Sequence, residues 1–339
     1  MPVGFREGIS FDGARRNWDD SGPRPLSWSA WYPASKDACV AAPATSSWFK
    51  REPVAWDARL ASSEATFPLV LLSHGSGSST AALEWLAYRL AQCGYVALGV
   101  NHHGHTGGEP YRAEGFLCLW ERARDFSALL DDPSWRHAVG GAVDNEACVA
   151  GFSAGAYTAM LLMGARVAYS QFEPGNPVKS PIRGPREFPD LIDELPRLRD
   201  VPVFRESWER RRSDYTDPRI KRAAVIAPGR SVLGFAKDSL QTIRKPIQLY
   251  GGGDDTVAPP AECCEWLHKN VPGSTCEIIT GVGHYTFLPE GTEIGDQAAP
   301  ELFQDKLGVE RRAVHACVAQ RIAGFCGCAP VASVLGERD

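Results

Sequence analysis

The sequence predicts an α/β fold in which a mostly parallel β-sheet carries helices on both faces. Short apolar, β-rich runs end in Gly or Pro, and stretches with helical spacing of apolar residues lie between them. Strands that alternate with helices favour such a sheet. The chain has 339 residues, of which 44% are apolar and 23% are charged, so we expect one large domain over 1–339 with decorations.

The expected elements follow from these patterns, and together they predict a sheet of about eight strands. The predicted strands are Leu26–Pro33, Phe67–Gly75, Gly94–Gly104, Ala147–Ser153, Arg222–Gly229, Lys245–Gly253 and Thr275–His284. The first alternates and is expected to be antiparallel. The predicted helices are Ser79–Gly94, Ala156–Ala168, Pro260–Asn270 and Arg311–Phe325.

The segment 169–218 does not fit this alternation. It is rich in Pro, Arg and acidic residues and has no clear strand, and so long a loop in a compact domain is either functional or disordered. Its aromatic residues favour an ordered cap, which we expect to be a lid over a site. They are Phe172, Phe188, Phe204, Trp208 and Tyr215. Residues 35–65 form a second polar excursion.

The charge and the apolar pattern exclude several classes of partner. The net charge is −5, and no basic face suggests a nucleic-acid partner. No apolar run is long enough for a signal peptide or a membrane span, so we expect a cytoplasmic location and no membrane partner. The ten cysteines are scattered, and we expect free thiols. The alternative is a metal site formed by Cys326, Cys328, His315 and Cys317.

The stretch Gly151-Phe152-Ser153-Ala154-Gly155 is a G-x-S-x-G motif between a predicted strand and a predicted helix. A sharp strand–turn–helix pushes the central side chain out over the sheet edge, and small flanking residues prevent a clash of the neighbouring backbones. The helix N-terminus favours developing negative charge. We expect Ser153 to be a nucleophile, and the alternative is a serine in a glycine-flanked tight turn.

Acyl transfer at a serine needs about two preorganised N–H groups for the oxyanion. We expect one from Ala154, the residue after the nucleophile. The other should come from the loop His74-Gly75-Ser76-Gly77, which follows a predicted strand, and Ser76 is our choice. A phosphate-binding loop is the alternative, but the stretch contains neither G-K-[ST] nor G-x-G-x-x-G.

A serine hydroxyl needs a base, and His284 is the candidate. It ends the last predicted strand in a Gly-flanked loop, at the sheet edge where Ser153 is expected. The stretch NHHGHTGG offers a competing interpretation, in which its histidines bind a metal together with His74. We expect this loop to line the pocket instead. Its histidines are His102, His103 and His105.

These motifs and their order resemble the α/β-hydrolase superfamily. More narrowly, they resemble the bacterial predicted dienelactone hydrolases related to platelet-activating-factor acetylhydrolase. The matching pieces cover nearly the whole chain: WYPA (Trp31–Ala34), LLSHGSG, GFSAGAYTA, SDYTDPRIKRAAVIAPG, GGGDDTVAPP and GVGHYTFLPEGT. The resemblance implies hydrolysis of carboxylic esters or related acyl bonds, without a metal or another cofactor. A true dienelactone hydrolase uses a Cys nucleophile, so Ser153 argues against dienelactone itself.

The resemblance also locates the acid of a triad. An α/β-hydrolase carries it after the strand before the last, in the order Ser, acid, His, and that position falls in GGGDDTVAPP. The family pattern has the acid three residues after a Gly and four before a Pro. Gly252 and Pro259 fulfil both conditions for Asp255, whereas Asp254 lies one residue too early for Pro259.

The expected function is therefore that of a serine hydrolase, which cleaves an ester, lactone, thioester or amide through an acyl-enzyme. Its triad would be Ser153, Asp255 and His284. We expect a small substrate with an apolar portion and a pocket formed by His74, His103, Phe152, Tyr285 and Trp208. The alternatives are a non-catalytic binding protein on a hydrolase scaffold and a metal-dependent hydrolase using the His102–His105 cluster. No oligomeric state follows from the sequence.

Overall fold

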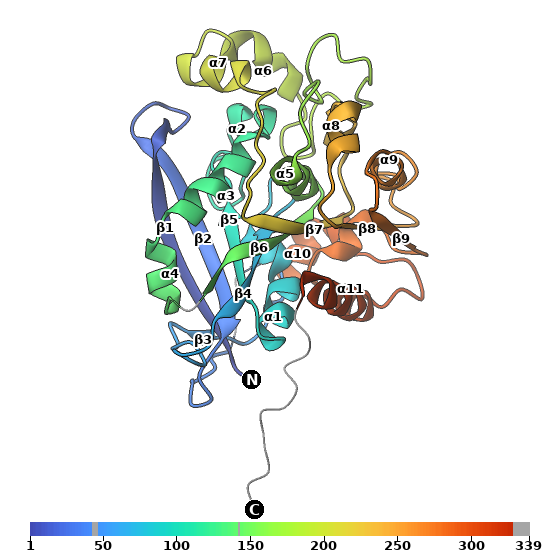
Figure 1. Ribbon diagram of the computed structural model, residues 1–339. Coiled ribbons are helices and arrows are strands. Elements are labelled where there is room, and N and C mark those ends of the chain that lie inside the picture. The colour runs from blue at the N-terminus through green and yellow to red at the C-terminus, as the bar shows by residue number, and fades with distance from the viewer. Residues whose placement is uncertain (43–46, 142, 328–339) are drawn as a thin grey trace, which may run out of the picture.

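The computed structural model describes residues 1–42, 47–141 and 143–327 and has the predicted α/β architecture (Figure 1). Within these residues nine strands form one sheet, in the order β3-β1-β2-β5-β4-β6-β7-β8-β9. β1 pairs antiparallel with β2, and β2 antiparallel with β5, while all pairs from β5 to β9 are parallel. The strands are β1 (Val3–Arg16), β2 (Pro23–Pro33), β3 (Ala55–Trp56), β4 (Phe67–Ser73), β5 (Val96–Asn101), β6 (Val143–Phe152), β7 (Ile220–Ile226), β8 (Ile247–Gly252) and β9 (Thr275–Ile279).

Helices cover both faces of the sheet. In Figure 1, α5, α8 and α9 lie above the strands β7–β9, and α1 and α11 lie below them. The α-helices are α1 (Glu84–Gln92), α2 (Ala113–Leu117), α3 (Glu121–Asp131), α4 (Ser134–Val139), α5 (Ala154–Met163), α6 (Leu191–Leu198), α7 (Pro202–Glu209), α8 (Lys237–Thr242), α9 (Cys264–Asn270), α10 (Glu293–Ala298) and α11 (Arg311–Cys326). This arrangement confirms the predicted fold class.

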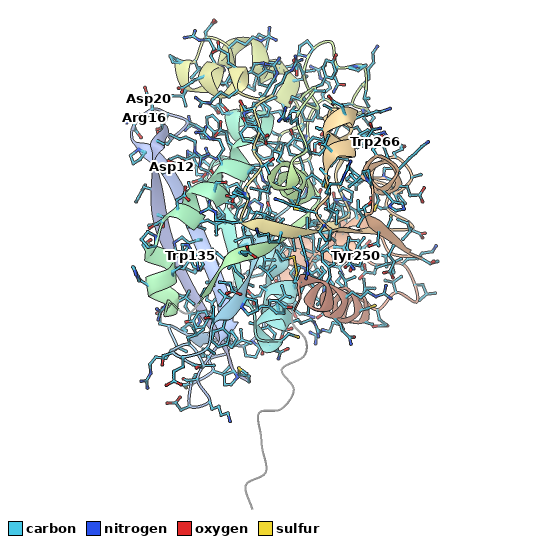
Figure 2. All side chains as sticks on the ribbon, viewed as in Figure 1. Asp12, Arg16, Asp20, Trp135, Tyr250 and Trp266 are labelled. Atoms are coloured by element: carbon cyan, nitrogen blue, oxygen red, sulfur yellow. A yellow bond between two sulfur atoms is a disulfide. The ribbon has the colours of Figure 1, made fainter. Side chains whose placement is uncertain are left out.

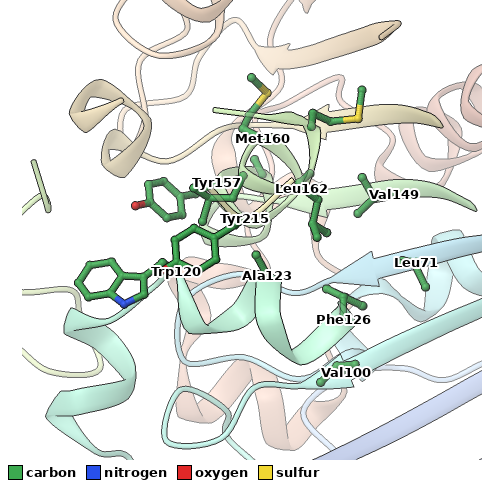
Figure 3. Close-up of a cluster of buried hydrophobic side chains, with 14 of the residues drawn as sticks. Leu71, Val100, Trp120, Ala123, Phe126, Val149, Tyr157, Met160, Leu162 and Tyr215 are labelled. Atoms are coloured by element: carbon green, nitrogen blue, oxygen red, sulfur yellow. The ribbon is translucent and has the colours of Figure 1, made fainter. Parts of the chain in front are cut away.

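The continuous apolar run of β4 follows from its position between the two helical layers. Leu69 and Leu71 belong to the apolar cluster that includes residues of α3 and α5, whereas Val70 and Leu72 belong to the cluster with residues of α1 and α11. Successive strand side chains point to opposite faces, so a strand covered on both faces must be apolar throughout. Figure 3 shows part of the first cluster, including Leu71 of β4 and Phe126 of α3.

β1 is the long strand that the sequence does not predict. It runs over 14 residues beside β2, and only the two-residue β3 lies beyond it in the sheet. Its apolar residues are interrupted by Arg6, Glu7, Ser10 and Asp12, and its exposed side chains include the apolar Ile9 and Phe11. Figure 2 shows Asp12, Arg16 and Asp20 at the far end of the β1–β2 hairpin, where Arg16 Nε lies 2.7 Å from Asp20 Oδ1.

The segment 169–218 contains α6 and α7, which lie above α2 in Figure 1. Phe204 and Trp208 of α7 are buried, and Trp120 Nε1–H donates to the Ser207 carbonyl at 3.1 Å. Tyr215, which follows α7, packs in the cluster formed with α3 and α5 (Figure 3). The aromatic residues of the segment therefore attach it to the sheet domain.

The cysteine expectation needs a correction. Cys148 of β6 and Cys326 at the end of α11 form a disulfide, with their Cα atoms 5.8 Å apart, so they are not free thiols. Sequence spacing could not reveal this pair, because 178 positions separate the two residues. Cys328, the further cysteine of the alternative metal site, lies outside the described residues. No helix in the described part of the chain is long and apolar enough to cross a bilayer.

Candidate active site

Ser153 lies at the sharp turn between β6 and α5. Its φ is 54° and its ψ is −112°, a strained conformation for a residue with a side chain. The turn is as tight as the motif predicts, because a Cβ added to Gly155 would lie 1.8 Å from the Ser73 carbonyl oxygen. A Cβ on Gly151 would lie 2.1 Å from the Gly155 oxygen. Both glycines are thus required by close backbone contacts.

His284 and Asp255 reach this turn from the loops after β9 and β8. His284 Nε2 lies 3.1 Å from Ser153 Oγ, and His284 Nδ1 lies 2.6 Å from Asp255 Oδ2. Asp255 Oδ1 accepts the N–H of Ala258 at 2.7 Å, which fixes the carboxylate, and both Asp255 and His284 are buried. The structure thus joins the three side chains of the candidate triad in one hydrogen-bonded series.

The two residues chosen for the oxyanion lie beside the same serine. Ala154 is the first residue of α5, so its N–H has no helical partner. The Ser76 N–H donates to no carbonyl oxygen among the described residues. A Cβ on the adjacent Gly75 would lie 3.6 Å from Ser153 Cβ, which places this loop against the serine. Ser76 and Ala154 both line the cavity that contains Ser153.

A cavity of about 540 Å³ has Ser153 and His284 in its wall. The segment 169–218 closes one side of it with Gln171, Phe172, Ile182, Pro185, Arg186 and Glu187. The polar excursion 35–65 contributes Trp48 and Phe49, which the sequence did not single out. The only sequence signal for these two residues was that they are adjacent aromatic residues in a polar segment. The cavity is lined by seven aromatic side chains: Trp48, Phe49, Tyr111, Phe116, Phe152, Phe172 and Tyr285.

Comparison with known proteins identifies the family. Residues 69–296, more than half of the chain, match the alpha/beta hydrolase family. The chain belongs to this family. A ferulic acid esterase from Streptomyces cinnamoneus has a similar structure, with a TM-score of 0.64 at 21% identity over 100% of this chain and 93% of that one. An esterase of Pyrococcus furiosus gives a TM-score of 0.47 at 12% identity over 95% and 94%. No curated protein shows significant sequence similarity.

Two of the five expected pocket residues of this alpha/beta hydrolase, Phe152 and Tyr285, do line the cavity. The other three expected residues do not line the cavity. His74 is completely buried, and its Nδ1 contacts the Gly75 carbonyl at 2.7 Å. His103 contacts Glu109 instead, with Nδ1 2.8 Å from Oε1. Trp208 packs on Trp120 and Phe204, because α7 turns its apolar face toward the domain core.

The histidines of NHHGHTGG already use both ring nitrogens, so a metal would have to displace protein partners from each ring. The partners are Asp125 and Ser73 for His102, Glu109 and the Trp18 N–H for His103, and Arg122 and Ser76 for His105. No group of three or more His, Cys, Asp or Glu side chains in residues 1–42, 47–141 and 143–327 is arranged to hold a metal. The metal alternative is therefore not favoured in this alpha/beta hydrolase.

The protonation of these buried rings follows from their surroundings. Burial, and then the positive charge of Arg122, lowers the pKa of His102 to about 3. The same two causes hold the pKa values of His74 and His105 well below the usual range. All three rings are thus neutral at neutral pH, and each donates from one nitrogen and accepts at the other. Only His105 among them reaches the cavity wall.

Proposed function

We propose that this alpha/beta hydrolase is a serine esterase that works through an acyl-enzyme. The observation that carries the proposal is the series of hydrogen bonds from Ser153 Oγ through His284 to Asp255, at the wall of a cavity large enough for a small molecule. Nucleophile, base and orienting acid in this order are the parts that acyl transfer requires. The strained serine and the two nearby N–H groups support the same reaction.

The proposed mechanism follows from the hydrogen bonds among these three side chains. His284 Nδ1–H donates to Asp255, which leaves Nε2 free to accept the Ser153 proton as Oγ attacks the substrate carbonyl. The backbone N–H groups of Ser76 and Ala154 stabilise the oxyanion. His284 then gives its proton to the leaving alcohol and later activates the water that releases the acyl group. No cofactor is needed for these steps.

We propose a small ester with an apolar, preferably aromatic, portion as the substrate. The aromatic side chains of the cavity wall provide flat apolar contacts for such a group. The segment 169–218 would act as a lid, since six of its residues close one side of the cavity. The structural neighbour from Streptomyces cinnamoneus is a ferulic acid esterase, so esters of aromatic acids are a sensible first set of substrates.

The relation to dienelactone hydrolases and platelet-activating-factor acetylhydrolases remains a proposal that rests on the sequence motifs. A cytoplasmic location likewise stays a prediction, and the disulfide weighs against it. Disulfides such as Cys148–Cys326 persist mainly in oxidising compartments. We therefore favour an exported protein. Immunodetection in cytoplasmic and extracellular fractions of the native cells decides between the two.

The direct test is the Ser153→Ala variant. We expect it to lose hydrolysis of p-nitrophenyl esters and labelling by a fluorophosphonate, with unchanged circular dichroism. Ser213→Ala, in an exposed part of the segment 169–218, is the control and should keep both activities. Turnover that survives in pure Ser153→Ala would disprove the mechanism. A wild-type protein that neither turns over nor becomes labelled would favour the ligand-binding alternative.

A further inference from the structure

Arg122 of α3 is a buried guanidinium outside the proposed triad. It is 1% exposed and does not line the cavity. Its Nη1 contacts His105 Nδ1 at 3.1 Å, and its Nη2 contacts both Ser73 Oγ at 3.1 Å and the His74 carbonyl. All these partners are neutral. The Arg122 Nε–H has no hydrogen-bond partner among the described residues.

Such an arrangement is costly for the fold. A buried charge is normally paired, as it is for Arg15 and Arg24, which both contact the Asp125 carboxylate, at 2.8 and 2.7 Å. Burial lowers the pKa of Arg122 to about 9, even though the charge of Asp125 opposes this shift. A buried cation without a direct counter-ion suggests that its hydrogen bonds serve a purpose beyond stability.

On one side, Arg122 sets the direction of a chain of hydrogen bonds. A guanidinium only donates, so His105 Nδ1 must accept, and the proton of the neutral ring is on Nε2. Nε2–H then donates to Ser76 Oγ at 3.2 Å. The Ser76 hydroxyl is left to donate to Glu187 Oε2, at 3.4 Å, in the segment that closes the cavity.

On the other side, Arg122 holds the preceding residues of the same loop. Its Nη2–H groups donate to Ser73 Oγ and the His74 carbonyl, so the Ser73 hydroxyl donates to His102 Nε2, at 3.1 Å. The His102 backbone N–H donates to His74 Nε2 at 3.2 Å, which leaves Nδ1–H for the Gly75 carbonyl. Arg122 thus contacts Ser73 and the His74 carbonyl directly and Ser76 through His105, while the His74 ring contacts the Gly75 carbonyl.

We propose that Arg122 is a positioning residue for the loop 73–76, which carries the Ser76 N–H toward the oxyanion. The inference rests on the proposed function, because an oxyanion forms only if Ser153 attacks an acyl group. Oxyanion donors act only when they are held in place before the reaction. Arg122 ties the loop at several points and keeps a positive charge in the low-dielectric interior behind it.

The test compares Arg122→Met, Arg122→Lys and, as a matched control, Arg124→Met. Arg124 lies two residues further on the same helix, is partly exposed and pairs with Glu121. For Arg122→Met we expect kcat on p-nitrophenyl acetate to fall about 30- to 100-fold, while KM stays within about twofold. Fluorophosphonate labelling should slow by a similar factor. Arg122→Lys should lose less, and Arg124→Met should behave as wild type.

A merely structural role predicts a different result. Arg122→Met would then lower the melting temperature but keep kcat within about twofold per folded molecule, and this outcome overturns the proposal. If Arg122→Met does not fold, Ser76→Ala decides. It keeps the N–H but removes the hydroxyl between His105 and Glu187, so we expect kcat about three- to tenfold lower at an unchanged melting temperature. Wild-type kcat in Ser76→Ala overturns the proposal.

Failure of the proposed function gives a separate signature. In that case the wild type shows no turnover or labelling that depends on Ser153, and the inference falls with it. When Ser153→Ala abolishes turnover but the Arg122 variants keep wild-type kcat, only the positioning role is wrong.

Discussion

Asp254 and Asp255 are neighbours in the chain, yet their carboxylates have different partners. Asp255 Oδ2 lies 2.6 Å from His284 Nδ1, in a buried position. Asp254 Oδ2 lies 2.6 Å from Lys306 Nζ, in a pair whose side chains are 40% and 65% exposed. A shift of one position along the chain therefore decides whether the carboxylate contacts the proposed base or forms a surface ion pair.

This difference predicts unequal effects of the same substitution. Asp255→Asn should lower kcat about 10³- to 10⁴-fold, because an amide no longer holds the His284 tautomer or stabilises its charged form. Asp254→Asn removes an exposed ion pair, which contributes at most about 1 kcal/mol, and kcat should stay within about twofold. Steady-state kinetics of both purified variants on one p-nitrophenyl ester provides the measurement. The reverse order of effects would assign the acid to Asp254.

The glycines of the nucleophile turn predict a stability effect. In Gly155→Ala the new Cβ would lie 1.8 Å from the backbone oxygen of Ser73, and neither the helix α5 nor the strand β4 can move easily in the packed core. We expect a loss of about 3 kcal/mol or more in the free energy of unfolding. Gly324→Ala in α11, where a Cβ meets nothing within 4 Å, should instead stabilise by up to about 1 kcal/mol. Urea unfolding compares them, and equal stability of the two variants contradicts the packing argument.

The parts of the site that motifs carry were predictable. Strand ends and turn glycines place Ser153, His284 and Asp255 at one edge of a parallel sheet, because the loops after parallel strands meet there. The spacing of four residues to Pro259 was enough to prefer Asp255 over its neighbour. The structure joins these three side chains by hydrogen bonds.

Side-chain direction and long-range packing were harder to predict from the sequence. Trp208 was expected in the pocket. The amphipathic pattern of α7 does not tell whether its apolar face packs on the domain core or lines the cavity, and the structure packs Trp208 on Trp120. β1 was missed because Arg6, Glu7, Ser10 and Asp12 interrupt its apolar residues, so it lacks the continuous apolar run that marks the other strands. Arg122 lies in an ordinary helical stretch, and its significance depends on Ser73 and His105, which are far away in the sequence.

Buried neutral histidines predict that the protein is destabilised by mild acid. The pKa of His102 is lowered to about 3 and that of His315 to about 4, both mainly by burial, and those of His74 and His105 also fall. Between pH 6.5 and about 4 the unfolded chain binds more protons, so stability rises with pH and is lost as pH falls.

Each of these rings should lower the free energy of unfolding by about 1 kcal/mol for each pH unit of acidification within that window. Urea unfolding at pH 7 and pH 5 measures the loss. His315→Gln is the matched variant, because it removes one titrating ring while an amide N–H can still reach the Thr286 carbonyl. We expect a smaller pH slope for this variant. A free energy of unfolding that is equal at pH 7 and pH 5 in the wild type would refute the argument.

The disulfide between Cys148 and Cys326 predicts a dependence on reductant. It joins the strand that ends at the Ser153 turn to the last described helix, and 178 positions separate the two cysteines. Cross-links that close long loops restrict the unfolded chain, so Cys326→Ser should cost about 2–5 kcal/mol. Cys317→Ser, at an exposed position of the same helix, should cost less than about 0.5 kcal/mol. Dithiothreitol should lower the melting temperature of the wild type and of Cys317→Ser but leave Cys326→Ser unchanged, and equal shifts in all three would show that the bond does not form in solution.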